Sequence, residues 1–294
     1  MAYRIFTDSS ATLPDEIMKV YEDKFEIIPI LYTYDGKDYP SYEKGKSNDL
    51  KSFYDILRAK KKITTSCINE NTFINYFEPT LKQGIDIIYL GFSSGLSRTY
   101  DCSVDAVKIL QAKYPERKIL TLDTLCECMG LGLCVYRALK MQDEGASIDE
   151  IYKTVYDERL KINHIFTVAD LGYLYRGGRL SASKYYIASI IKIKPVLRMD
   201  EQGKLVVYSN VFGRKKSLIA LVDKMEQKIV DSENQTIFIG HADCLEDALF
   251  VKDLILKRMK VKEILLNYID PVIGSHSGPG TMSVYFYGDD RKVK

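Results

Sequence analysis

The sequence of 294 residues lacks any apolar run approaching the roughly 20 residues that a membrane-spanning helix needs. Its opening residues, MAYRIFTDSS, reach Asp8 before an apolar stretch of signal-peptide length appears. These absences argue against a membrane span and against secretion. We therefore expect a cytoplasmic protein.

The sequence also lacks an excess of charge, because 42 Lys and Arg residues stand against 40 Asp and Glu residues. The basic residues are scattered, apart from short runs at 60–62 and 214–216. A nucleic-acid binder usually gathers its basic residues on one surface. The sequence therefore gives nucleic-acid binding little support, whereas 46% hydrophobic and 28% charged residues are typical of a globular protein.

The cysteines lack the spacing of a cysteine-based site. They fit neither a disulfide framework nor paired C-x-x-C zinc spacing. The six are Cys67, Cys102, Cys126, Cys128, Cys134 and Cys244. We expect buried free thiols and no metal, because reduced cysteine behaves as a small hydrophobic residue.

The sequence contains short predicted strands that alternate with predicted helices. Residues 3–7 predict a strand, and the polar turn after them leads into a helix. Residues 25–34 predict another strand, and the almost wholly apolar residues 85–92 predict a strand covered on both faces. Such alternation indicates a mostly parallel sheet with helices on both faces. Ligands of these sheets bind beyond the carboxyl ends of the strands, where we expect several polar turns to converge.

The pattern changes near residue 160. Residues 194–211 predict two strands joined by a turn at Gly203, and such a hairpin indicates antiparallel pairing. We therefore predict an α/β fold in two domains. Residues 1–160 would carry a mostly parallel sheet covered by helices, and residues 161–294 a mixed or antiparallel sheet.

Residues 91–95, GFSSG, match the G-x-S-x-G pattern of the nucleophile elbow in serine hydrolases. A hydrolase would need an acid and a histidine after Ser93, and Asp243 and His276 could supply them. No oxyanion loop of the HGGG type precedes the motif. A serine-dependent esterase or lipase that uses Ser93 is one alternative.

The same hydroxyl groups could instead hold an anion without attacking it. Ser93, Ser94 and Ser97 stand before an expected helix, and hydroxyls together with free backbone N–H groups form a natural anion site. The helix dipole and neutral donors would stabilise a carboxylate there. A third reading is that these serines only cap the helix.

A second polar turn is predicted at residues 270–280, DPVIGSHSGPG. Glycine and proline make such a loop stiff and let a ligand approach the backbone closely. His276 lies between two serines in this loop. Of the three histidines, we single out His276 as a candidate ligand-binding residue.

Six ordered motifs resemble those of the DegV family, fatty-acid-binding proteins that act as the lipid-carrying subunit of bacterial fatty acid kinase. The motifs are TDSSATLP (7–14), TSC (65–67), SSGLSRTY (93–100), FTVADLGYLYRGGRLS (166–181), IGHADC (239–244) and PVIGSHSGPG (271–280). Together they extend over nearly the whole chain. The resemblance favours serines that hold a ligand and makes the G-x-S-x-G match coincidental.

The resemblance implies two α/β domains with a long-chain fatty acid buried between or beside them. It places the carboxylate of the acid near Thr65, Ser93, Ser94, Ser97 and His276. A separate kinase subunit would phosphorylate that carboxylate with ATP, so the chain would not be an enzyme by itself and would need no cofactor. The absence of a Walker A sequence agrees with this implication.

The chain departs from the family pattern in two places. Cys67 and Ile68 stand where the family often has Gln and Pro, and Arg98 stands where it often has Gly. The first departure would alter the pocket near the head group, and the second adds a cation to the first turn of a helix. Neither departure reveals which acyl chain is preferred.

Three arginines, Arg176, Arg179 and Arg214, lie in or beside the glycine turn and the second-domain hairpin. Cations near the opening of the site would help to dock a kinase and offset phosphate charge, so we expect them to serve the partner or phosphotransfer. The alternative is that they are ordinary solvated arginines. We further expect a monomer that makes transient contact with a membrane surface.

Overall fold

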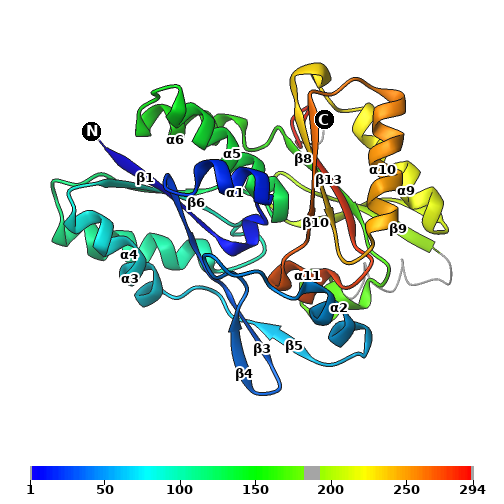
Figure 1. The fold of residues 1–294 in the computed structure, drawn as a ribbon, viewed down its shortest axis with the longest axis horizontal. Helices are drawn as coiled ribbons and strands as arrows, with labels where there is room; N and C mark the ends of the chain where they lie inside the picture. The colour runs from blue at the N-terminus through cyan, green and yellow to red at the C-terminus, as the bar shows by residue number, and fades with distance from the viewer. Residues whose placement is uncertain (1, 182–192, 293–294) are drawn as a thin grey trace.

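The computed structural model describes residues 2–181 and 193–292. Three sheets organise this part of the chain: one of four strands, one of six and a small one of three. Figure 1 shows the four-stranded sheet with its helices beside the six-stranded sheet, and the small sheet projecting below them. Within the described ranges, the helices all fall short of the length and apolar character that a membrane span requires.

The four-stranded sheet is parallel throughout and has the strand order β2-β1-β6-β7. Its strands are β1 (Tyr3–Asp8), β2 (Phe25–Ile28), β6 (Asp86–Gly91) and β7 (Ile119–Asp123). The associated helices are α1 (Asp15–Tyr21), α3 (Glu70–Lys82), α4 (Thr99–Lys113), α5 (Cys128–Asp143) and α6 (Ile148–Glu158). Every residue of β6 is buried, as its apolar sequence predicts for a strand covered on both faces.

The six-stranded sheet is mixed and has the order β10-β9-β8-β13-β11-β12. Only the β11–β12 pair is parallel among its described pairings. Its strands are β8 (Ile162–Thr167), β9 (Ile193–Met199), β10 (Leu205–Phe212), β11 (Thr236–His241), β12 (Glu263–Tyr268) and β13 (Met282–Tyr287). Helices α9 (Arg214–Glu226) and α10 (Leu245–Arg258) pack together over this sheet (Figure 1).

Helix α5 lies between the two larger sheets and joins their cores. It packs on β1 and β6 of the first sheet and on β8, β11 and β13 of the second. Its residues 128–135 are all buried, as expected for a helix that is apolar on every side. The resulting hydrophobic cluster contains residues of both sheets, such as Ile5 and Phe238.

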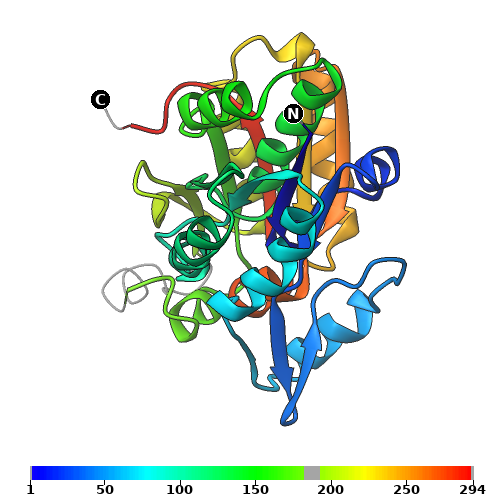
Figure 2. The same ribbon diagram turned by 90° about the vertical axis from the view of Figure 1, so that its left-hand side faces the viewer.

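The small sheet has the order β4-β3-β5 and is antiparallel. It consists of β3 (Leu31–Tyr34), β4 (Lys37–Pro40) and β5 (Ile63–Thr65), and it lies near α2 (Leu50–Arg58), as Figures 1 and 2 show. The single strand predicted at residues 25–34 is wrong, because β2 ends before Pro29 and β3 begins in another sheet. Proline has no backbone N–H to donate to a strand ladder, and β2 ends directly before it.

The predicted α/β fold, with a mostly parallel sheet followed by a mixed one, is confirmed. The hairpin of β9 and β10 turns at Gly203 as the sequence predicts. Division into domains at residue 160 falls in the link between α6 and β8. That division remains a proposal. Helix α5 and one hydrophobic cluster join the two parts, so the fold itself does not mark a boundary between them.

Candidate ligand-binding site

A cavity of about 270 Å³ lies where the turns after β1, β5 and β6 meet strand β13 and helix α11 (Pro271–Ser277). Its wall is mainly apolar. The apolar side chains include Ile30, Phe92, Leu96, Phe166, Leu174, Leu205, Ile269, Val272 and Ile273. A cavity of this kind suits the alkyl part of a ligand, and a few polar groups would orient it.

Three of the predicted carboxylate ligands, Thr65, Ser97 and His276, line this cavity together. Nε2 of His276 lies 2.8 Å from Oγ1 of Thr65. Nδ1 of His276 is buried against Gly177, where an added Cβ atom would lie 2.4 Å away, and it has no partner among the described residues. A buried N–H without an acceptor is costly, so we infer that Nε2 carries the proton and donates it to Thr65. The hydroxyl hydrogen of Thr65 is then free to point at a ligand.

The electrostatics of this group favour an anion. Burial, with the nearby charge of Arg179 acting in the same direction, lowers the pKa of His276 to about 4. The imidazole is therefore neutral at pH 7. Arg179 lines the cavity as well, and its Nε donates to the carbonyl of Leu96 at 3.1 Å. An anion here would meet neutral donors and a guanidinium, which keeps its charge in proteins.

His276 lies on a helix and not in the loop that the sequence predicts. Asp270 begins α11 by accepting from the N–H of Val272 at 2.7 Å, and Pro271 occupies the first turn. Gly278, with φ of 80°, follows the last residue. These are standard start and stop signals, but they enclose only seven residues, too few for an apolar periodicity to show. The loop prediction for residues 271–277 is wrong.

Ser93 and Ser94 are placed outside the cavity lining. Ser93 is fully buried; its Oγ donates to the carbonyl of Gly203 at 2.8 Å and accepts from the N–H of Gly95 at 3.2 Å. Ser94 is exposed, and its N–H donates to Asp123. In this geometry Ser93 holds the turn of the β9–β10 hairpin against the turn after β6.

The three residues of the hydrolase alternative are not brought together. Ser93 bonds to a backbone carbonyl, and His276 bonds to Thr65. Asp243 accepts from Arg58 and from the hydroxyl of Tyr268. The geometry therefore gives the esterase alternative no support.

A second hollow of about 610 Å³ adjoins the cavity, and the two share Thr65, Arg179 and His276. We call it the basic hollow, because Arg176 and residues 60–62, all lysine, also line it. In the sequence this lysine run stands out as a short exception to the scattered basic charge, and no role in the site was predicted for it. Its position just before β5, which ends at Thr65, was the signal that could have linked it to the site.

The three predicted arginines fall in different places. The guanidinium of Arg176 lies 4.8 Å from the centroid of the Tyr173 ring, at the basic hollow. Arg179 lies between the hollow and the cavity. Arg214 begins α9 and donates to Asp247 of α10 at 2.7 and 2.9 Å, and it lines neither hollow nor cavity.

The three residues that depart from the family pattern lie in two different places. Cys67 and Arg98 line the cavity, whereas Ile68 is buried in the cluster that contains Phe73. Across residues 2–181 and 193–292, no group of three or more His, Cys, Asp and Glu side chains is arranged to hold a metal ion.

Comparison with known proteins gives consistent results. A family model described as "Uncharacterised protein, DegV family" matches residues 2–289. A DegV domain-containing protein of Clostridium perfringens is 42% identical over 288 residues, which cover 98% of each chain.

Two solved structures extend the comparison. A fatty acid binding DegV family protein from Streptococcus agalactiae is 27% identical, with a TM-score of 0.85 over 99% of this chain and 100% of the other. The fatty acid kinase B3 protein from Streptococcus pneumoniae, loaded with linoleic acid, gives a TM-score of 0.84 over 98% and 100% of the chains. Its identity of 18% shows a shared fold alone.

Proposed function

Because the chain belongs to the DegV family, we propose that it binds one long-chain fatty acid in the cavity and presents the carboxylate to a separate fatty acid kinase subunit. The observation that carries the proposal is that Thr65, Ser97 and His276 line one mainly apolar cavity, with Thr65 and His276 hydrogen bonded to each other. The relative from Streptococcus agalactiae, which is described as fatty acid binding, supports the same reading.

In this proposal the binding free energy comes from burial of the apolar tail and from hydrogen bonds to the carboxylate. Burying about twelve methylenes at ~0.8 kcal/mol each would supply roughly 10 kcal/mol before ordering and desolvation costs. The hydroxyls of Thr65 and Ser97 would donate to the carboxylate, with Arg179 nearby to offset its charge. Ser93 and Ser94 would act indirectly, by holding the turn that carries Ser97.

The basic hollow supports presentation to a kinase. Thr65 and His276 line it as well as the cavity, so a partner docked there would approach the carboxylate of the acid. Lysines and arginines around such an opening would attract the phosphates of bound ATP. In this proposal the kinase supplies ATP and catalysis, and the chain works as a cytoplasmic monomer that collects acids at the membrane surface.

Alanine substitution tests the head-group assignment. We expect Ser97→Ala and His276→Ala each to weaken fatty acid binding by ~1–3 kcal/mol, about fivefold to 150-fold. Ser97→Ala removes a hydroxyl donor to the carboxylate, and His276→Ala removes the hydrogen bond that orients the hydroxyl of Thr65. Isothermal titration of delipidated protein with oleic acid measures the change. Ser103→Ala is the matched control, since that hydroxyl bonds to Tyr100 and Thr121 and lies outside the cavity lining. Parental affinity in both head-group variants would show that the carboxylate lies elsewhere.

A further inference from the structure

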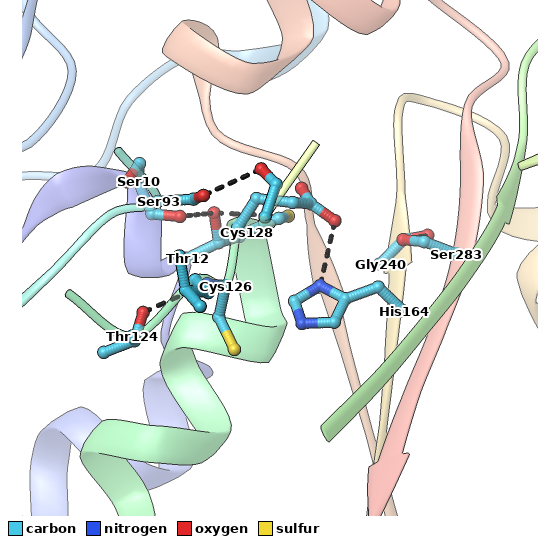
Figure 3. A network of polar contacts seen from close by, with 12 residues as sticks. Ser10, Thr12, Ser93, Thr124, Cys126, Cys128, His164, Gly240 and Ser283 are labelled. Carbon is cyan, nitrogen blue, oxygen red and sulfur yellow. Dashed lines mark hydrogen bonds and ion pairs between the residues drawn. The ribbon is translucent and has the colours of Figure 1, made fainter. Parts of the chain in front are cut away.

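Glu127 is a carboxylate in the wall of the ligand cavity that the head-group proposal does not use. It directly precedes α5 and is only 7% exposed. Its Oε1 lies 3.2 Å from Nδ1 of His164, a contact drawn as a dashed line at His164 in Figure 3. Among the described residues, no hydrogen bond reaches Oε2. Half of the acceptor capacity of a buried carboxylate is therefore left for whatever fills the cavity.

His164 holds Glu127 in place from behind the cavity wall. The imidazole is buried on β8, nearly perpendicular to the ring of Tyr285, with 5.3 Å between the ring centroids. It packs on Gly130 of α5, where an added Cβ atom would lie 2.0 Å from Cε1. Burial pulls the pKa of His164 down, but Cys126 and Glu127 raise it more, so the net shift is upward.

Three hydroxyls of the cavity wall donate to other groups and so do not satisfy Oε2. Ser10 donates to Asp8, and Ser283 donates to the carbonyl of Gly240 at 3.1 Å. Thr281 donates to carbonyls at the end of α11. An alkyl chain has no donor, so filling this space with plain methylenes would remove Oε2 from water without compensation.

This second polar point is separate from the head-group site. Thr65 and His276 are hydrogen bonded to each other, whereas Glu127 is held by His164. His276 reaches the cavity from α11, whereas Glu127 reaches it from the start of α5. A ligand bound by its carboxylate at Thr65 and His276 would therefore pass Glu127 with another part of its chain.

We propose that Glu127 determines ligand specificity by accepting a hydrogen bond from a hydroxyl group on the acyl chain. The preferred ligand of this cavity is then a hydroxylated long-chain fatty acid. This inference rests on the proposed function and adds the chemical class of the acid.

Competitive titration of the delipidated full chain tests it. The probes are octadecanoic acid and a panel of hydroxyoctadecanoic acids that differ in the position of the hydroxyl. We expect at least one positional isomer to bind about tenfold or more tightly than octadecanoic acid, as a hydrogen bond to a charged acceptor predicts. Glu127→Leu should abolish this preference by bringing the affinities of the isomers to that of octadecanoic acid.

Two further variants make the outcome decisive. Glu127→Gln keeps the shape and a neutral acceptor, so it should reduce the preference, and it replaces Glu127→Leu if that variant does not fold. Ser103→Ala removes a hydroxyl outside the cavity wall and should keep the preference. If octadecanoic acid binds but no isomer binds more tightly, or if the preference survives at both Glu127 variants, the inference is overturned and the proposed function stands. If no acid of either kind binds, the proposed function fails first.

Discussion

Asp270 shows at the scale of a single residue how the site is held in place. Its Oδ2 accepts from Thr12 at 2.7 Å, and its Oδ1 accepts from the first N–H groups of α11. Burial raises the pKa of Asp270 to about 6, although these hydrogen bonds oppose the change. The carboxyl group thus links the turn after β1 to the helix that carries His276.

This raised pKa predicts a pH dependence of stability. The native state holds the Asp270 proton more strongly than the unfolded state, so its contribution is complete below about pH 4 and is lost as the pH rises through about 6. Asp270→Asn, which resembles the protonated form, should remove this fall of at most ~3 kcal/mol. Urea unfolding of both proteins at pH 4, 5, 6 and 7 measures it. A constant difference between them over that range would contradict the assignment.

At the scale of elements, the cavity depends on one close contact between two turns. An added Cβ atom at Gly95 would lie 2.6 Å from the carbonyl oxygens of Gln202 and Gly203, so the turn after β6 touches the hairpin backbone directly. Ser93 bonds to the same hairpin turn, and Leu205 just beyond it lines the cavity. The contact therefore positions one side of the ligand-binding wall.

Gly95→Ala should break this contact. Backbone atoms cannot move aside as a side chain can, so we expect a loss of ~1–3 kcal/mol in the free energy of unfolding together with weaker fatty acid binding. Gly145→Ala is the control, because Gly145 has φ of 86° but open space around it. It should cost ~1–2 kcal/mol and leave binding unchanged. Parental binding by Gly95→Ala would show that the hairpin turn does not shape the cavity.

The elements were predictable from the sequence where apolar patterning was long enough. The buried strand at residues 85–92 and the hairpin turn at Gly203 follow from local patterns and are present. Helix α11 was not predicted, because it has only seven residues. A single strand was predicted across Pro29, because the residues on both sides of this proline are apolar. The position of Glu127 could not be inferred, since it depends on pairing between distant strands that brings His164 behind the cavity.

At the scale of the whole molecule, the cavity has walls from the parts of the chain that carry both larger sheets, and it adjoins the basic hollow. Its wall takes Phe92 from the turn after β6 and Phe166 from β8. The shared lining of Thr65, Arg179 and His276 connects it to the basic hollow. One arrangement can thus both enclose an alkyl chain and leave a carboxylate within reach of a partner.

Partner docking at the basic hollow predicts which cations matter for phosphorylation. Arg176→Ala and Lys62→Gln should retain bound acid but slow acyl-phosphate formation in an assay reconstituted with a fatty acid kinase subunit, because both line the hollow. Arg179→Ala should reduce both, since Arg179 also lines the cavity. Arg214→Ala should leave the rate of acyl-phosphate formation unchanged, because Arg214 pairs with Asp247 and does not line the hollow. A slower rate would favour the sequence-based hypothesis that Arg214 serves the partner. Unchanged rates in all four variants would place the partner elsewhere.

The measurement that tests the central claim most directly is native mass spectrometry of the protein purified without delipidation, followed by lipid extraction. The account predicts one bound long-chain acid per chain, which delipidation removes and added acid restores. It further predicts that filling the cavity, as in Leu174→Trp, lowers this occupancy while the protein stays folded by circular dichroism. A folded parent protein that carries no acid and takes up none when acid is added would contradict the account.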